Sequence, residues 1–173
     1  MERSYSAALP VAYVLLRLLV VLNWLLAAAI LTLLVALPNE RWIMSALDLT
    51  PSAQASRIVW SLRGVAVVGL VAAPLNHVVL SRLLAMVGSV RYGDPFVRAN
   101  AYRLRAIAWS LLGLQLLGLV VVALGKVIAS QGRQVDFDSS FSLAGWLAVL
   151  LTFVLARVFA EGALMREDLE ATI

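Results

Sequence analysis

The side chains that can do chemistry in this 173-residue sequence are few, and the first group lies inside long apolar runs. Asn23, Asn76 and His77 are the notable polar residues there, and Pro74 precedes the Asn–His pair. Such a pair can bind a ligand or relay a proton within a membrane. More often it forms a hydrogen bond between packed helices, which is the role that we favour.

Enzymatic chemistry has little support in these residues. His77 is the only histidine and the sequence contains no cysteine. A lone histidine does not make a metal site, and thiol chemistry is excluded. The apolar runs also lack an acid–base pair for catalysis. We therefore expect no catalytic, cofactor-binding or metal site, and a protein that is not an enzyme.

The second group of reactive side chains lies in residues 91–105, between two apolar runs. Gly93 is suited to end a helix, Asp94 to cap the next one and Pro95 to occupy its first position. The sequence therefore predicts a helix that begins at Pro95 and continues into the following run. It carries an apolar strip bordered by arginines, made of Val97, Ala101, Leu104 and Ala108. This pattern is typical of a helix leaving the headgroup layer.

The end of the chain is acidic and is predicted to continue the last helix beyond Ala156. We expect this acidic tail to dock against the basic segment, or both to form one protein-binding surface. The alternative is ordinary membrane-flanking arginines beside a solvated tail. The predicted cytoplasmic contact surface consists of Asp94, Phe96, Asn100, Arg103, Arg105, Glu161, Asp168 and Glu170.

The elements that must position these groups are four runs free of Asp, Glu, Lys and Arg, at 18–37, 64–81, 106–125 and 139–156. About 20 apolar residues in a helix cross the hydrocarbon core of a bilayer. The sequence predicts an all-α polytopic membrane protein, a four-transmembrane-helix bundle with cytoplasmic helix extensions. We expect a single domain over 1–173, with spans at about 14–37, 62–84, 106–128 and 141–160.

Composition and charge agree with a membrane protein. Apolar residues make up 62% of the chain and charged residues 14%, outside the range of soluble domains. The 14 Lys and Arg against 10 Asp and Glu give a net charge of +4. These cations are scattered, so we expect contact with the lipid bilayer and no direct contact with nucleic acid. Nine of the 14 flank the termini and the middle loop, which predicts that both termini lie in the cytoplasm.

Particular residues of the middle loop and the tail resemble those of a known family. They are Gly93-Asp94-Pro95-Phe96, Asn100, Leu104-Arg105 and Trp109, with Phe159, Gly162, Leu164, Asp168-Leu169-Glu170 and Thr172. The sequence is similar to the bacterial membrane proteins catalogued as domain of unknown function 2975, and this resemblance implies that the protein lies in a bacterial inner membrane. Members often carry a glutamate where this chain has Ala99. Genes of the family frequently lie beside a small Xre/Cro-type helix-turn-helix regulator, so the resemblance implies such a regulator as partner.

Two functions from different classes follow. The first is a regulatory or sensory membrane protein that signals to, or sequesters, the helix-turn-helix regulator at the cytoplasmic face. The alternative is a subunit of an oligomeric small-molecule transporter or channel, with a cavity around Asn23, Asn76 and His77. Glycine and alanine on the predicted spans make a homo-oligomer compatible with either function.

Overall fold

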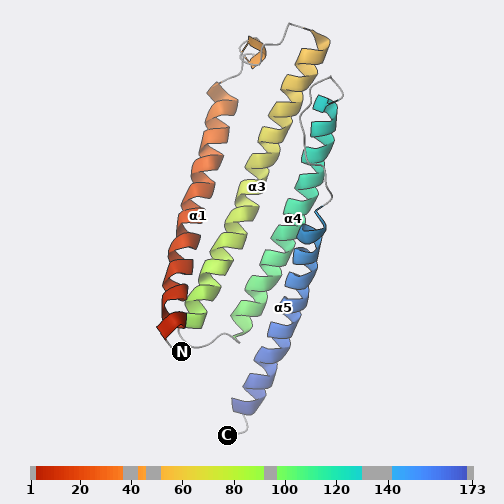
Figure 1. The fold of residues 1–173 in the computed structure, drawn as a ribbon. Coiled ribbons are helices and arrows are strands. Elements are labelled where there is room, and N and C mark those ends of the chain that lie inside the picture. Colours follow the sequence, from red (N-terminus) through yellow and green to blue (C-terminus); the bar gives the residue numbers. More distant parts are fainter. Residues whose placement is uncertain (1–2, 37–42, 46–51, 92–96, 130–141, 171–173) are drawn as a thin grey trace. The chain divides into compact units, whose positions relative to one another are not determined.

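The computed structural model describes residues 3–36, 43–45, 52–91, 97–129 and 142–170, and all regular structure in them is helical (Figure 1). The long helices are α1 (Arg3–Ala36), α3 (Ala53–Arg91), α4 (Arg98–Ala129) and α5 (Leu143–Glu170). By length and composition each of the four can cross a membrane. The all-α, four-span prediction is confirmed, and the protein is a multi-pass membrane protein.

The helices are longer than the predicted spans because flanking polar residues continue them. Serines cap two of their starts. The amide of Ala55 donates to Oγ of Ser52 over 3.1 Å, and the amide of Gly145 donates to Oγ of Ser142 over 3.1 Å. A serine before a helix in this way satisfies an amide that has no partner within the helix. The predicted helix start at Pro95 lies outside the described residues, and α4 is helical from Arg98.

Contacts divide the chain into two compact units. Unit 1 comprises Met1–Asn23, Leu75–Gly113 and Ser142–Ile173, and unit 2 comprises Trp24–Pro74 and Leu114–Phe141. In α3 the border follows Pro74, which lacks the N–H that the helix would otherwise use there. The single-domain organisation stays a prediction.

Unit 2 is packed around small side chains. Ala55 and Val59 of α3 are 2% and 0% exposed and form a cluster with the buried Met44. A Cβ atom added at Gly64 would lie 3.0 Å from Cδ1 of Leu124, so α3 and α4 approach each other closely within this unit. Such close approach is how helices gain packing contacts in a membrane.

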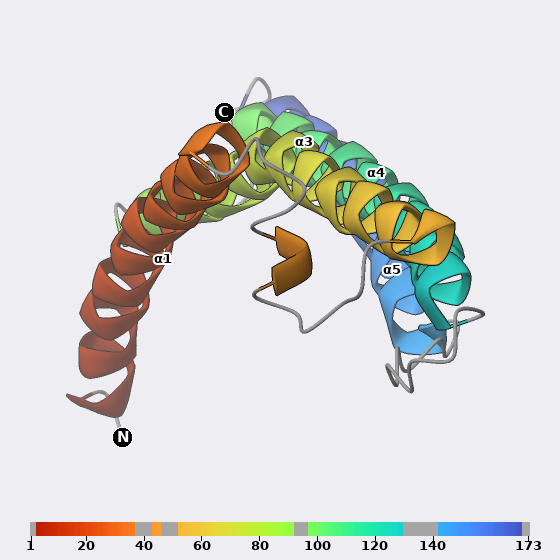
Figure 2. The same ribbon diagram turned by 90° about the horizontal axis from the view of Figure 1, so that it is seen from above.

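In unit 1, the first half of α4 lies beside α5 (Figures 1 and 2). The apolar strip predicted from sequence is buried at Ala101, Leu104 and Ala108. Ala156 and Ala163 of α5 are also buried. The buried alanines permit α4 and α5 to lie close together.

Many large apolar side chains on the helices are exposed. Examples from both units are Leu15, Leu25 and Leu150, which are 56%, 61% and 61% exposed. Exposed leucines on this scale are unfavourable in water but are what lipid-facing helix surfaces require. The described helices therefore present their apolar side chains to a bilayer.

Candidate functional site

A buried polar cluster holds the start of α4 against the end of α3 in unit 1. The side chain of Asn100 is 1% exposed and donates from Nδ2 to Oγ of Ser89 over 2.8 Å. Oγ of Ser89 lies 2.8 Å from the carbonyl oxygen of Met86, to which it donates. We call Ser89, Asn100 and Arg103 the Asn100 network.

Arg103 completes this network. Its Nη1 atom lies 2.8 Å from Oδ1 of Asn100 and 3.3 Å from the carbonyl oxygen of Ala85, and it donates to both. Within the described residues, no buried side-chain nitrogen or oxygen is left without a partner. A buried amide that is fully hydrogen-bonded ties two helices together, whereas an unsatisfied one would be costly. The network therefore sets the direction in which α4 begins.

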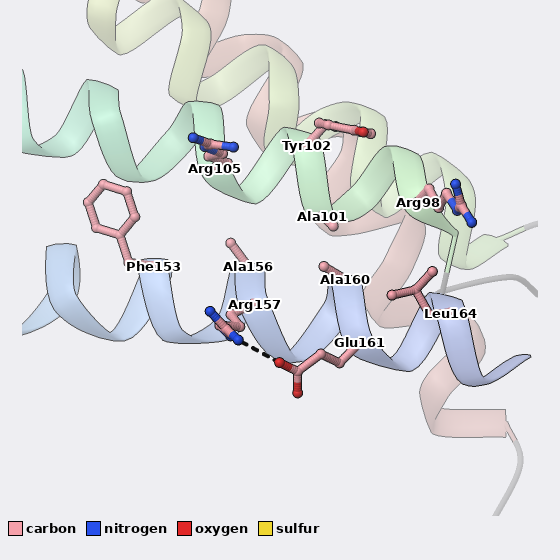
Figure 3. Close-up of a pocket in the computed structure, with 10 residues that line it drawn as sticks. All are labelled: Arg98, Ala101, Tyr102, Arg105, Phe153, Ala156, Arg157, Ala160, Glu161 and Leu164. Atoms are coloured by element: carbon pink, nitrogen blue, oxygen red, sulfur yellow. Dashed lines mark hydrogen bonds and ion pairs between the residues drawn. The ribbon is translucent and has the colours of Figure 1, made fainter.

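A groove of about 570 Å³ lies between the first half of α4 and the second half of α5, both in unit 1 (Figure 3). We call it the α4/α5 groove. Residues spaced at helical periodicity on the two facing surfaces line it: Arg98, Ala101, Tyr102, Arg105, Phe153, Ala156, Arg157, Ala160, Glu161 and Leu164. Ala101, Ala156 and Ala160 lie between the two helices, and charged side chains stand at the edges (Figure 3). The groove is therefore apolar at its floor and mainly basic at its rim.

Two ion pairs lie at this rim. The guanidinium of Arg98 pairs with the carboxylate of Glu167, joining α4 to the end of α5. Nε of Arg157 donates to Oε1 of Glu161 over 3.0 Å, one turn along α5. The four side chains are 49–81% exposed. Exposed pairs contribute only about 0–1 kcal/mol each, so either can open readily.

An aromatic contact lies at the apolar end of the groove. The rings of Trp109 and Phe153 meet edge to face, with centroids 5.3 Å apart and planes at 88°. This is a favoured arrangement for aromatic rings. It fixes the spacing of α4 and α5 on the side of the groove nearest the charge-free segments of both helices.

The structure brings some predicted contact residues together and separates others. Arg105 and Glu161 line the α4/α5 groove, and Asp168 is exposed further along α5. Asn100 differs from the prediction, because its buried amide is not accessible to a partner and instead positions α4. Arg103 is partly buried beside it.

Three further predicted contacts cannot be placed in the same way. Asp94 and Phe96 lie outside the described residues, and the side chain of Glu170 does as well. One ion pair, between Arg98 and Glu167, joins the basic segment to the acidic tail, and the wider docking of the tail stays a prediction.

The sequence-based reasoning missed several residues of the site. Arg157, Tyr102 and Leu164 line the groove, and Ser89 anchors Asn100. The spacing of Arg98, Tyr102 and Arg105 on one helix face was a usable signal. Ser89 could not be identified from the sequence, because serine is a common residue in membrane helices.

The polar residues inside the predicted spans form a separate group. Asn23, Asn76 and His77 are partly buried in unit 1, and none of them lines the α4/α5 groove. Asn23 and His77 both take part in interactions with other residues. Among the described residues, no three His, Asp or Glu side chains are grouped so that they could hold a metal ion.

Comparison with known proteins identifies one family. The family described as "Protein of unknown function (DUF2975)" matches residues 35–173. Neither a curated protein nor a solved structure matches the chain. The match covers α3, α4 and α5, and with them the Asn100 network and the α4/α5 groove.

Proposed function

Because this chain belongs to the DUF2975 family, which is described as being of unknown function, we propose a role from its own geometry. It is a non-enzymatic regulatory membrane protein that binds a protein partner through the charged surface formed by the start of α4 and the end of α5. Positive charge gathers at this end of the helices, which supports its placement in the cytoplasm of a bacterium.

The observation that carries the proposal is the exposed ion pair between Arg98 and Glu167. It joins two helices but is about half exposed on both sides, so it contributes little to stability. A partner with its own charged groups can replace it by intermolecular pairs at small net cost. The surface therefore suits reversible binding, with open and closed arrangements of the end of α5.

The Asn100 network gives the start of α4 a fixed position, in contrast to the exchangeable ion pair between Arg98 and Glu167. Asn100 and Arg103 hold α4 to α3 through hydrogen bonds to Ser89 and to the carbonyl oxygen of Ala85. The start of α4 is thus a fixed platform, and the end of α5 is the element that can be released. By the family resemblance, the partner is a small Xre/Cro-type helix-turn-helix regulator, which the membrane protein sequesters or releases.

Co-purification tests the proposal. The tagged protein, expressed with the regulator encoded beside it, should retain that regulator in detergent extracts of the membrane. Arg98→Glu should reduce retention of the regulator, because the new carboxylate repels acidic groups of a partner. It also repels the carboxylate of Glu167. Arg57→Glu is the matched control, since Arg57 is exposed in unit 2. Equal retention by all three proteins, or none by the unmodified one, contradicts the proposal.

The transporter alternative has a separate test. It requires a pathway near Asn76, whereas the groove described above is lined by other residues. Solute flux in liposomes that is abolished by Asn76→Leu would favour transport over regulation.

A further inference from the structure

Two arginines, Arg105 of α4 and Arg157 of α5, line the α4/α5 groove. The two side chains belong to different helices and stand at the same level of the α4/α5 groove (Figure 3). Arg105 is the last charged residue before the charge-free run 106–125, and Arg157 is the first one after the run 139–156. Both arginines therefore mark the point at which their helices leave the hydrocarbon core, where lipid phosphates lie.

The groove is apolar at one end and charged further along its length. At one end Phe153 lies against Trp109, inside the charge-free segments. Beyond the two arginines the lining reaches Arg98 and Leu164. An occupant must therefore be apolar on the membrane side and anionic at the level of Arg105 and Arg157. A volume of about 570 Å³ falls in the range of ordinary small-ligand pockets and accommodates a headgroup with the start of an acyl chain.

The charges of the lining favour an anion. Three arginines face the groove with a single carboxylate, that of Glu161. Glu161 contacts Arg157 through Nε, whereas a guanidinium carries five N–H donors in all. Arg105 has no ion-pair partner within the part of the chain that the structure describes. The groove thus offers one guanidinium from each helix, and guanidinium groups donate well to phosphate oxygens.

We propose that the α4/α5 groove binds one anionic phospholipid of the surrounding bilayer, with its phosphate between Arg105 and Arg157 and an acyl chain along Phe153. The inference goes beyond the proposed function and does not require a protein partner. The bound lipid bridges α4 and α5, so it stabilises the arrangement in which the end of α5 is docked.

Native mass spectrometry of the full chain in detergent tests this site. Phosphatidylglycerol and phosphatidylcholine with identical acyl chains are the probes, and inorganic phosphate is the competitor. Phosphatidylglycerol should remain bound at least about tenfold more tightly than phosphatidylcholine, because charge-assisted hydrogen bonds to the phosphate are reinforced by a net negative headgroup. Millimolar phosphate should not displace it, since free phosphate lacks the apolar contacts.

The variant Arg105→Gln/Arg157→Gln should lose this preference, with phosphatidylglycerol affinity lowered about tenfold or more. The control is Arg82→Gln, which removes one positive charge, against two in the double variant, from an exposed position in unit 1 outside the groove. Arg105→Lys/Arg157→Lys retains the charge without the planar fork and should give intermediate affinity. Thermal unfolding in detergent checks that each variant is folded.

Three results would overturn the lipid site. The first is equal affinity for the two lipids, and the second is displacement by phosphate, which marks a site for free anions. The third is unchanged phosphatidylglycerol binding in Arg105→Gln/Arg157→Gln together with loss of a co-purified protein, which makes the groove a protein-docking surface. If phosphatidylglycerol binds as expected but no regulator co-purifies, the lipid site is supported and only the proposed regulatory function is contradicted.

Discussion

At the scale of single residues, Asn100 has the clearest physical role. Its amide is buried between α3 and α4 and bonds to both Ser89 and Arg103. A buried amide is favourable only while its partners are in place. Asn100 therefore affects the binding of a partner or lipid only indirectly, by positioning α4.

Replacing Asn100 by leucine tests this role. Asn100→Leu removes the hydrogen bonds to Ser89 and Arg103 and leaves the guanidinium of Arg103 without its nearest acceptor. We expect the free energy of unfolding to fall by about 1–3 kcal/mol, the usual cost of an unsatisfied buried polar group. Thermal or denaturant-induced unfolding in detergent measures it.

Ala99→Leu is the control for this substitution, because Ala99 is exposed one residue away on the same helix. It should change stability by no more than about 0.5 kcal/mol. If both variants were equally stable, the Asn100 network would not be what holds α4 to α3.

At the scale of elements, the close approach of α3 and α4 in unit 1 depends on Gly113. A Cβ atom at this position would lie 3.1 Å from Cδ1 of Leu75. For Gly118, five residues further along α4, no atom of another described helix lies within 4 Å of the corresponding point. The two glycines therefore provide a matched comparison between a packed and an open position.

Gly113→Leu should destabilise the protein by about 1–3 kcal/mol, because an inserted side chain forces the two helices apart. Gly118→Leu should have little effect on the same unfolding measurement. Shortening the opposing side chain with Leu75→Ala should restore part of the loss in Gly113→Leu. Additive effects of the two substitutions would show that the contact does not limit the spacing of the helices.

The contact between the start of α4 and the end of α5 can also be tested at the scale of elements. Arg98→Glu places two carboxylates opposite each other where Arg98 and Glu167 now pair. The end of α5 should then be cleaved faster in limited proteolysis, by roughly two- to fivefold, since an exposed pair contributes at most about 1 kcal/mol. The charge-swapped variant Arg98→Glu/Glu167→Arg should return cleavage to the original rate. Failure of this rescue would mean that the pair does not hold the tail.

At the scale of the whole molecule, the orientation in the membrane is the prediction with most consequence. The regulatory proposal requires the start of α4 to face the cytoplasm and the start of α3 to face the other side. The sequence contains no cysteine, so a single introduced cysteine reports its own accessibility without background. Gln54 near the start of α3 and Ala99 near the start of α4 are both exposed and suit this purpose.

In intact cells, a membrane-impermeant maleimide should label Gln54→Cys and should not label Ala99→Cys. After permeabilisation both variants should react. This expectation follows from the arginines around the middle loop and the termini, which are retained on the cytoplasmic side. The opposite labelling pattern would contradict the regulatory proposal. The surface formed by the start of α4 and the end of α5 would then face away from the cytoplasm.

The amino-acid sequence alone was sufficient for the four helices and the buried strip of α4. Runs without charge can satisfy their backbone in lipid only as helices, and the spacing of Ala101, Leu104 and Ala108 places them on one face. These are local properties, set by periodicity and by the solvent around the chain.

Only the tertiary structure decided which polar residues meet. Asn100 and Arg105 stand five positions apart in one basic segment, yet one is buried against Ser89 and the other lines a groove with Arg157. The helix period shows that they point in different directions, but it does not show which neighbouring helix each one faces. That depends on how α3, α4 and α5 pack within unit 1, and packing partners distant in sequence leave no trace in local spacing.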